Sequence, residues 1–294
     1  VLTGGDPMKR EDLFELIAYG REQRVPIAIT PATTPLLERR HLTELKRLGV
    51  MALGVSLDGS SAARHDGFRQ VEDTFDRALE ALDWAREVGL AVQVNTTVTA
   101  DTLSDLAALY ELLATRAHPP VRRWSLFLLV PVGRGTALGI PSAEQVEELF
   151  AWIYRVSADA PFHVSTVEAP HYRRYLLQKK LREGIGEREL IKLATGMGFG
   201  IRDGNGVIFV SHTGELFPAG FLPYPCLGNV KQTPLEVLYR ESPFLQQLRN
   251  ADGYRGRCGR CEFRWICGGS RARAFTMLGD PLESDPLCVY EPQQ

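Results

Sequence analysis

The sequence predicts an α/β protein made of a large part of repeated strand–helix units and a small cysteine-rich part at its C-terminal end. Up to about residue 185, short apolar runs alternate with amphipathic helical segments. After about residue 196 the pattern changes to glycine-rich stretches and a cluster of cysteines. The 294 residues are enough for one large or two modest domains. We therefore expect one domain over residues 1–195 and a second over 196–294.

The first part contains short runs with the near-continuous apolarity that is typical of strands buried on both faces of a parallel sheet. The runs cover residues 1–3, 26–30, 51–57, 90–98, 124–130 and 162–167. Between them lie helical segments, and two of these reach a glycine at the position of a C-terminal cap, Gly49 and Gly89. Regular strand–helix units of this kind predict a barrel or an open doubly wound sheet.

The second part begins with a glycine-rich stretch that predicts a β-hairpin. Its two strands are expected at 207–211 and 215–219, on either side of the turn sequence "HTG". A helix is expected near 233–250, followed by the cysteine segment. Because this part offers little apolar periodicity, we expect its order to depend on a bound metal.

Composition excludes several classes of function. The formal charge is −2 and no block of lysine and arginine is present, so nothing favours nucleic-acid binding. The hydrophobic share is 44%, and no apolar run approaches the roughly 18 residues that a membrane span needs. Five cysteines, an odd number and mostly clustered, favour metal-bound thiolates in a reducing compartment over a disulfide framework. We therefore expect a cytoplasmic protein.

Four cysteines form the pattern C-x2-C-x5-C-x20-C, and we refer to Cys258, Cys261, Cys267 and Cys288 as the cysteine set. Four thiolates suit tetrahedral zinc or an iron–sulfur cluster about equally by softness alone. Three ligands from one short loop and a distant fourth favour a cluster, because a zinc ribbon pairs two C-x2-C turns. The fifth cysteine, Cys226, is expected to be an incidental free thiol.

The N-terminal sequence "LTGGDP" is a turn that leads from a strand into a helix. One interpretation is purely structural, with Asp6 as the N-cap and Pro7 as the first helical residue. The other is functional: Gly4 and Gly5 let the backbone approach a ligand, and the Asp6 carboxylate faces a cationic group such as an ammonium. The turn lies at the C-terminal end of a strand, where barrel enzymes place their sites.

This turn is followed in order by "SLDG" (56–59), "HDGFR" (65–69), "NTTVT" (95–99) and "VPVGRG" (130–135). The combination resembles the radical S-adenosylmethionine (SAM) family, and the cysteine pattern resembles the SPASM or twitch domain that many of those enzymes carry. Together the two resemblances cover nearly the whole chain. They imply a partial (β/α)6 barrel that binds SAM and a [4Fe–4S] cluster, with a small C-terminal iron–sulfur domain.

The resemblance also assigns roles to individual residues. Gly4, Gly5, Asp6 and Pro7 match the turn that meets the SAM ammonium, with Asp6 where glutamate is usual. The remaining assignments are Ser56 to the methionyl part of SAM, Arg69 or Arg77 to its carboxylate, Asn95 to the ribose and Gly133 to the adenine. An arginine suits the carboxylate because a guanidinium pairs with it bidentately. As alternatives, Ser56 and Asn95 cap strand ends, and either arginine belongs to a solvated helix face.

The sequence departs from the family pattern in two places. It contains no C-x3-C-x2-C loop, which in the family binds the SAM-cleaving cluster. We therefore read the chain as lacking the first strand–helix unit, with that cluster in the missing N-terminal part, and expect it not to cleave SAM alone. In addition, Ala219 and Arg271 stand where a full SPASM domain has cysteines of its first auxiliary cluster. The cysteine set matches the second cluster completely, so we expect one auxiliary [4Fe–4S] cluster.

The resemblance implies an oxidoreductase or maturase that generates a 5′-deoxyadenosyl radical for hydrogen abstraction, served by a one-electron reductant such as flavodoxin or ferredoxin. The arrangement looks most like SPASM proteins that act on porphyrins in haem or modified-haem biosynthesis. Peptide-modifying maturases are one alternative, and a non-catalytic scaffold stapled by zinc or a cluster is another. Candidates to meet porphyrin carboxylates are Arg134, His171, Arg173 and Arg174, although a solvated helix face also explains the last three. No residue is predicted to be catalytic.

Overall fold

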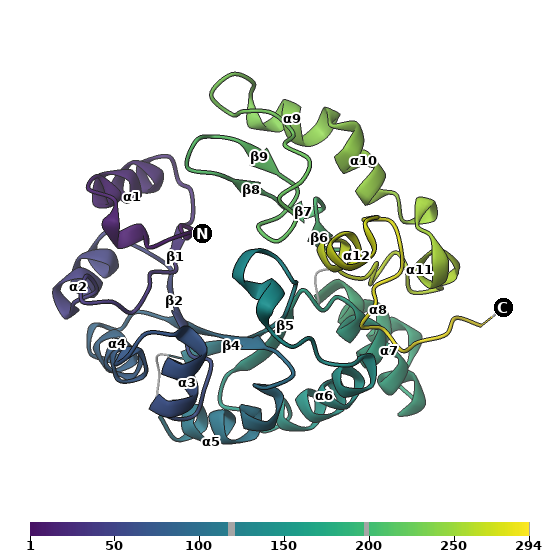
Figure 1. Ribbon diagram of the computed structural model, residues 1–294, viewed down its shortest axis with the longest axis horizontal. Helices are drawn as coiled ribbons and strands as arrows, with labels where there is room; N and C mark the ends of the chain where they lie inside the picture. Colours follow the sequence, from purple (N-terminus) through teal and green to yellow (C-terminus); the bar gives the residue numbers. More distant parts are fainter. Residues whose placement is uncertain (117–120, 197–199, 294) are drawn as a thin grey trace. The chain divides into compact units, whose positions relative to one another are not determined.

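The computed structural model describes residues 1–116, 121–196 and 200–293, and it has the α/β fold that the sequence predicts (Figure 1). Its main sheet has five strands in the order β1-β2-β3-β4-β5. The strands are β1 (Ala28–Ile29), β2 (Ala52–Ser56), β3 (Val92–Val98), β4 (Val121–Leu128) and β5 (His163–Val167). Leu2 joins this sheet through a parallel bridge to Ile29. Each apolar run expected to be a strand is therefore confirmed, with the first reduced to a single bridge.

The chain forms two compact units. The first comprises Val1–Phe127 and Arg155–Ser165, and the second comprises Leu128–Tyr154 and Thr166–Gln294. The expected domain boundary at residue 195 stays a prediction.

The helices of the first unit alternate with its strands. They are η1 (Pro7–Lys9), α1 (Leu13–Glu22), α2 (Arg39–Arg47), α3 (Ala62–Arg69), α4 (Thr74–Val88), η2 (Leu103–Asp105) and α5 (Leu106–Arg116). Figure 1 shows α2, α4 and α5 on the same face of the sheet. Gly89 ends α4 with a φ of 67°, and Gly49 follows α2 with a φ of 81°. This left-handed conformation favours glycine, so both predicted helix ends are confirmed.

The register of the sheet sets two polar side chains opposite each other. β2 runs parallel to both β1 and β3, and Ser56 is paired with Asn95. The residues that precede them, Val55 and Val94, are fully buried. Because parallel strands end at the same edge of a sheet, the buried apolar pattern fixes Ser56 and Asn95 near that edge.

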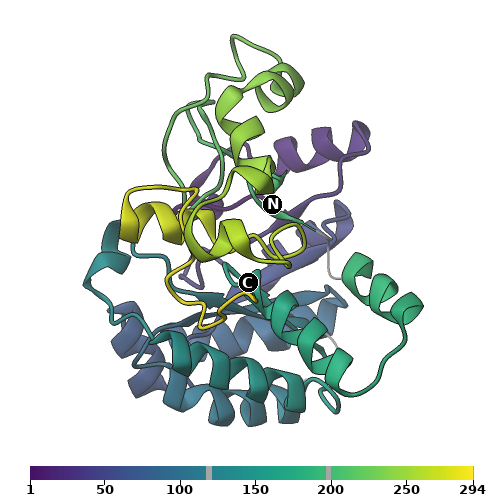
Figure 2. The ribbon, with the colours of Figure 1, turned by 90° about the vertical axis from the view of Figure 1, so that its right-hand side faces the viewer.

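The second unit contains short elements. They are η3 (Gly133–Ala137), α6 (Ala143–Val156), α7 (His171–Arg182), α8 (Glu187–Gly196), β6 (Arg202–Asp203), β7 (Gly206–Val207), β8 (Phe209–Val210), β9 (Leu216–Phe217), α9 (Leu235–Glu241), α10 (Pro243–Arg249), η4 (Ala251–Gly253), α11 (Gly256–Arg260) and α12 (Arg271–Leu278). The last two residues of α6 belong to the first unit. Figure 2 shows α7 and α8 side by side.

The antiparallel pair β8 and β9 confirms the predicted hairpin. The single helix expected near 233–250 is instead two helices, α9 and α10. The Ser242 hydroxyl accepts a hydrogen bond from the Leu245 backbone N–H, and Pro243 is the first residue of α10. A serine cap followed by proline starts a new helix, because proline has no N–H to continue the previous one.

An apolar core holds this second unit together, although its sequence shows little apolar periodicity. Its buried members are Val130, Ala219, Leu222, Leu245, Leu248, Ala251, Tyr254, Ala272 and Leu282. They come from several short segments, so no single segment shows a helical or strand periodicity. The expected dependence of this unit on a metal stays a prediction.

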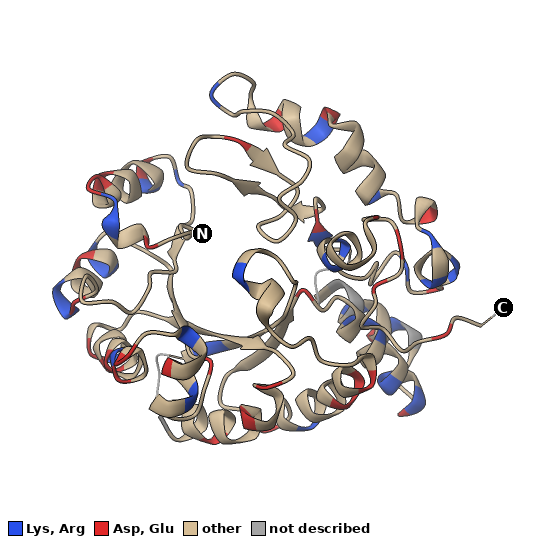
Figure 3. Cartoon of the chain, viewed as in Figure 1, with Lys and Arg blue, Asp and Glu red and all other residues tan. Residues whose placement is uncertain are grey.

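Acidic and basic residues are interspersed along the helices of each unit (Figure 3). This distribution agrees with the small net charge of −2. In the residues that the structure describes, no helix is both long enough and apolar enough to cross a membrane.

Candidate functional site

The N-terminal turn is fixed by the carboxylate of Asp6. Oδ1 of Asp6 accepts a hydrogen bond from the Met8 N–H at 3.1 Å, which makes Asp6 the N-cap of η1. Its Oδ2 accepts from the Thr34 hydroxyl at 3.1 Å. Gly4 and Gly5 have φ values of 88° and 56°, and a Cβ built on either meets no atom within 4 Å. The turn therefore has the capped geometry of the structural interpretation together with two glycines that face open space.

Ser56, the last residue of β2, is paired with Asn95, in the middle of β3. Both side chains are half-buried. The Asn95 side-chain oxygen accepts a hydrogen bond from Gln93 Nε2 at 2.8 Å, and its backbone oxygen accepts from the Leu57 N–H at 2.9 Å. Among the described residues, the Asn95 side-chain NH2 makes no hydrogen bond, so both of its donors are unused.

The loop after β2 is held by the buried carboxylate of Asp58. Oδ1 of Asp58 accepts from the Thr97 N–H at 2.6 Å. Oδ2 accepts from Arg69, with Nε at 2.7 Å and Nη2 at 2.5 Å. Arg69 is therefore already paired with a carboxylate of its own chain. His65, the first residue of the motif "HDGFR", also has a structural role. Its Nδ1 accepts a hydrogen bond from the Asp58 N–H at 2.9 Å.

Arg77 lies in the first turn of α4 and is half-buried. Among the described residues its guanidinium has no hydrogen-bond or ion-pair partner. Of the two arginines that the resemblance offers for the SAM carboxylate, Arg77 is the one that is not already paired with a carboxylate among the described residues. Gly133 belongs to the second unit, where it begins η3 with a φ of 53° and faces open space.

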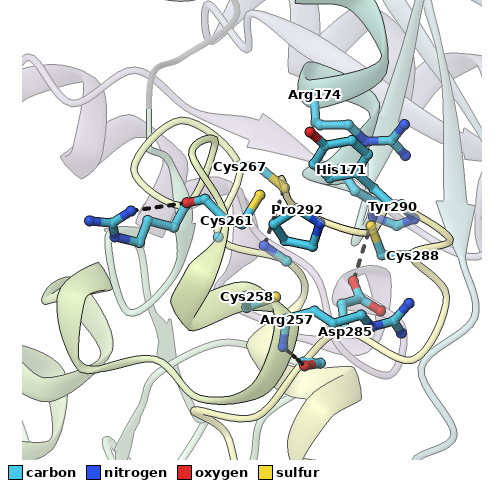
Figure 4. Close-up of a pocket in the computed structure, with 14 residues that line it drawn as sticks. His171, Arg174, Arg257, Cys258, Cys261, Cys267, Asp285, Cys288, Tyr290 and Pro292 are labelled. Atoms are coloured by element: carbon cyan, nitrogen blue, oxygen red, sulfur yellow. Dashed lines mark hydrogen bonds and ion pairs between the residues drawn. The ribbon is translucent and has the colours of Figure 1, made fainter. Parts of the chain in front are cut away.

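The cysteine set lines a single pocket of the second unit, which we call the cysteine pocket (Figure 4). The pocket encloses about 410 Å³, part of it open to solvent. Cys258 lies on α11, Cys261 and Cys267 lie in the following loop, and Cys288 comes from the C-terminal segment. Cys226 is exposed and does not line the pocket, and its nearest polar partner is the Gly228 carbonyl oxygen at 3.6 Å.

The four cysteines line the same pocket, and Figure 4 shows their sulfur atoms around it. Among the described residues, no three His, Cys, Asp or Glu side chains are placed to hold a single metal ion. Tetrahedral zinc needs all four sulfur atoms at about 2.3 Å from one ion. Thiolates spread around a cavity fit the corners of an iron–sulfur cluster better.

Burial controls the charge of these thiols. It raises the pKa of Cys261 to about 11, and it also raises the pKa values of Cys267 and Cys288. The thiols of Cys261, Cys267 and Cys288 therefore stay protonated at neutral pH unless positive charge enters the pocket. An iron centre supplies that charge and displaces the protons.

Two further residues of the pocket carry nitrogen atoms without a hydrogen-bond partner. Among the described residues, the buried side-chain polar atoms in this condition are Nδ1 and Nε2 of His171 and Nε of Arg174. Burial lowers the pKa of His171 to about 4, so its imidazole is neutral and carries one N–H. Unpaired buried donors are rare in proteins, and here both side chains line the cysteine pocket. A sulfur-rich group bound there would supply the missing acceptors.

The solvated helix face proposed for α7 is wrong for two of its three residues. The exposed fraction of the side chain is 0% for His171 and 3% for Arg174. Arg174 makes a bidentate ion pair with Glu147, at 2.6 and 2.5 Å. Arg173 donates to the Ile201 carbonyl oxygen at 2.7 Å. Arg134 is the one member of the proposed porphyrin-contacting group that is exposed.

Ala219 and Arg271, at the positions where the resemblance expects two more cysteines, make other contacts in the structure. Ala219 belongs to the apolar core of the second unit. Arg271 is fully buried, and its Nη2 lies 3.6 Å from the sulfur of Cys258. Both environments agree with a single complete set of cysteine ligands.

Sequence reasoning missed a pair of carboxyl groups, Glu168 and Asp203. Oε2 of Glu168 accepts from the Ser270 hydroxyl at 2.5 Å, and Oδ2 of Asp203 accepts from the Ala272 N–H at 2.8 Å. Burial, and then the charge of Asp203, raise the pKa of Glu168 to about 8. Burial also raises the pKa of Asp203. The pair therefore holds a proton at neutral pH.

The available signal for Glu168 was its place directly after the run "FHVSTV", at the end of a predicted strand. It has a left-handed φ of 55°, which is uncommon for a non-glycine residue and concentrates at functional sites.

The sequence of this chain is similar to those of known radical SAM proteins. The profile of the radical SAM superfamily matches residues 1–113. The AdoMet-dependent heme synthase of Nitratidesulfovibrio vulgaris is 38% identical over 296 residues, covering 100% of this chain and 79% of the relative. The protein of the same name from Methanosarcina barkeri is 32% identical, covering 99% of this chain and 82% of the relative.

Among solved structures, SuiB of Streptococcus suis bound to S-adenosylmethionine superimposes with a TM-score of 0.72. The match covers 98% of this chain and 65% of that protein, slightly less than two thirds, at 16% sequence identity. At this identity the likeness establishes the fold, and it includes both units.

Proposed function

Since this chain belongs to the radical SAM superfamily, we propose that it is a radical SAM enzyme of haem biosynthesis that acts on a porphyrin. One observation carries the substrate class: identity of 38% to an AdoMet-dependent heme synthase extends over the whole chain, including the cysteine-rich unit. Superfamily members use SAM and a [4Fe–4S] cluster. When bound, these groups supply one-electron chemistry that yields a 5′-deoxyadenosyl radical for hydrogen abstraction.

Residues of the first unit would bind SAM at the sheet edge. Gly4 and Gly5 leave backbone open to the ammonium, and Ser56 and Asn95 offer polar side chains at paired positions of β2 and β3. For the carboxylate we propose Arg77, because Arg69 is already paired with Asp58. For the adenine the proposal stays Gly133. Asp6 orients the turn through its cap, and Pro7 starts η1 in a buried position.

The cysteine set would hold one auxiliary [4Fe–4S] cluster. The spread of the sulfur atoms around the cysteine pocket and the unpaired nitrogen atoms of His171 and Arg174 support a sulfur-rich group over zinc. The clustered thiols also support a reducing compartment, for which we propose the cytoplasm. A one-electron donor such as flavodoxin or ferredoxin would serve as the reductant.

Titration with an iron porphyrin tests the substrate class without requiring catalysis. The chain, reconstituted with iron and sulfide, is titrated with an iron porphyrin that carries propionate groups, and the Soret band is followed. The matched control is the same porphyrin with its propionates esterified. We expect saturable binding of the acid at one per chain and at least tenfold weaker binding of the ester, since carboxylates seek basic partners. Equal binding of both, or none, contradicts a porphyrin substrate and favours the peptide-modifying alternative.

The exposed Arg134 offers a variant for the same titration. We expect Arg134→Gln to weaken binding of the acid and to leave binding of the ester unchanged. Arg155→Gln, which removes the same charge from an exposed position of α6, serves as its control.

A further inference from the structure

We propose that Arg271 and His171 donate hydrogen bonds to the sulfur atoms of the cluster in the cysteine pocket and thereby raise its reduction potential. The inference rests on the proposed function, because it requires a cluster in this pocket. It goes beyond that function because it assigns control of the reduction potential of the cluster to two residues that are not its ligands.

Arg271 brings an unneutralised positive charge to the cysteine set. Its side chain is fully buried, and Nη2 lies 3.6 Å from Sγ of Cys258, within reach of a hydrogen bond to sulfur. In the described part of the chain its other hydrogen bonds go to carbonyl oxygens, and none goes to a carboxylate.

The arginines that line the pocket itself differ from Arg271 in this respect. Each of them is paired with a carboxylate: Arg174 with Glu147, Arg257 with Glu291 and Arg264 with Asp252. Their charges are thereby largely compensated. Among the described residues, Arg271 therefore adds a buried positive charge beside Cys258 that no carboxylate neutralises through a direct ion pair, although Asp203 also feels its charge.

The surroundings of Arg271 hold its guanidinium in place. Nη1 donates to the carbonyl oxygens of Pro281 at 2.9 Å and Glu283 at 2.7 Å, and the guanidinium carbon lies 4.6 Å from the centre of the Tyr254 ring. A Cβ added to Gly269 would lie 2.5 Å from Nη2. The absence of a side chain at Gly269 thus allows the close approach of Arg271 to Cys258.

His171 supplies an independent observation on the opposite wall, from α7. Its side chain has no exposed surface, and within the described residues neither ring nitrogen makes a well-formed hydrogen bond, although the Leu287 backbone also interacts with the ring. Nδ1 lies 3.5 Å from Asp285 Oδ2. This distance is long for a hydrogen bond, so the carboxylate attracts a proton on Nδ1 only weakly. An unpartnered buried imidazole in a pocket of four cysteines indicates an acceptor that the pocket is built to receive.

The direction of the effect follows from charge. Reduction adds one electron to a cluster that four thiolates already make electron-rich. N–H donors and a nearby positive charge stabilise that added charge, and they act strongly in a buried site because little water screens them. Hydrogen bonds to the sulfur atoms are among the factors that set the potentials of such clusters. The cluster is thereby suited to accept an electron.

A redox titration followed by electron paramagnetic resonance tests this assignment in the reconstituted chain. Iron and sulfide are measured first, so that only loaded protein is compared. We expect Arg271→Gln to lower the ratio of reduced to oxidised cluster about tenfold at fixed potential, which corresponds to about 59 mV for one electron. We expect Arg271→Lys, which keeps the charge, to recover part of that loss. His171→Leu should shift the ratio in the same direction by a smaller factor.

Arg264→Gln is the matched control, because it removes the same charge from the pocket lining at a guanidinium bound to Asp252. It should change the ratio less than Arg271→Gln does. If Arg271→Gln does not fold, His171→Leu against Arg264→Gln decides the question. Loaded variants with the wild-type potential overturn the inference and leave the proposed function intact. A wild-type chain that binds zinc and no iron overturns both.

Discussion

Arg69 and Asp58 form an ion pair in which Nη2 of Arg69 lies 2.5 Å from Oδ2 of Asp58. The Asp58 side chain has no exposed surface, whereas 36% of the Arg69 side chain is exposed. Asp58 also accepts the Thr97 N–H, so the pair connects the loop after β2 to β3. Arg69 therefore has a structural partner, and for the SAM carboxylate we propose Arg77.

Replacing Arg77 with glutamine should weaken SAM binding. A charged hydrogen-bonding pair contributes about 1.5–3 kcal/mol, which corresponds to a dissociation constant raised about tenfold or more. Isothermal titration calorimetry with SAM measures this change, and thermal unfolding should be unaltered because Arg77 has no partner among the described residues.

Arg69→Gln is the matched comparison. It should lower the free energy of unfolding by about 1–3 kcal/mol, because it leaves the buried Asp58 carboxylate without its cation. If Arg69→Gln abolished SAM binding in a stable protein while Arg77→Gln had no effect, the assignment of the two arginines would have to be exchanged.

Asp66 illustrates a motif residue whose role is structural. Its Oδ1 accepts from the Thr74 hydroxyl and the Phe75 N–H, both at 2.8 Å, and its Oδ2 accepts from the Asp73 N–H at 3.0 Å. These bonds cap the start of α4. Asp66→Ala should lower the melting temperature by about 2–4 °C, the usual effect of a lost cap in a protein of this size, with no change in SAM affinity. A loss of affinity at unchanged melting temperature would show that Asp66 contacts the ligand.

The Glu168–Asp203 pair predicts a pH dependence of stability. The folded chain holds the Glu168 proton up to about pH 8, whereas an unfolded chain releases it near the ordinary value of 4.5. Between these values the folded state binds more protons, so this group makes the free energy of unfolding fall as pH rises. Glu168→Gln cannot ionise and should flatten the decline between pH 5 and 8.5, measured by urea denaturation.

Glu183→Gln provides the control for this measurement. Glu183 is exposed, and hydrogen bonds from Lys180 and Tyr154 lower its pKa below the usual value. It is ionised in both states above pH 5, so its removal should leave the slope unchanged. Identical slopes for Glu168→Gln and the wild-type chain would contradict a shared proton in the pair.

Most of the fold could be predicted from the sequence because the main sheet is built from continuous apolar runs. The strand runs and the caps at Gly49 and Gly89 are local signals, and the structure has each of them. The core of the second unit was not predictable in this way. Its members, such as Ala219, Leu245 and Ala272, come from separate short segments and become neighbours only in the tertiary structure.

The candidate site was likewise predictable in part from the sequence. The spacing of the cysteines predicted a shared site, and the structure brings all four to one pocket. The burial of His171 and Arg174 was missed, because a helix rich in basic residues looks solvated when its packing partners are unknown. The proton shared by Glu168 and Asp203 was missed for a similar reason, since their sequence separation of 35 residues hides the contact.

Two serine variants distinguish a cysteine of the set from the exposed Cys226. Cys288→Ser removes a ligand of the cysteine set and should sharply lower the iron bound after anaerobic reconstitution. Cys226→Ser changes an exposed thiol outside the pocket and should leave iron binding unchanged. Loss of iron in Cys226→Ser would make Cys226 a ligand.

The central claim is that the cysteine pocket holds one [4Fe–4S] cluster. Its most direct test is the content of iron and acid-labile sulfide in the 294-residue chain after anaerobic reconstitution. We expect about four of each per chain. About eight of each per chain would show a second cluster. About one zinc per chain with no sulfide would show a zinc site. Either result would contradict a single [4Fe–4S] cluster in the cysteine pocket.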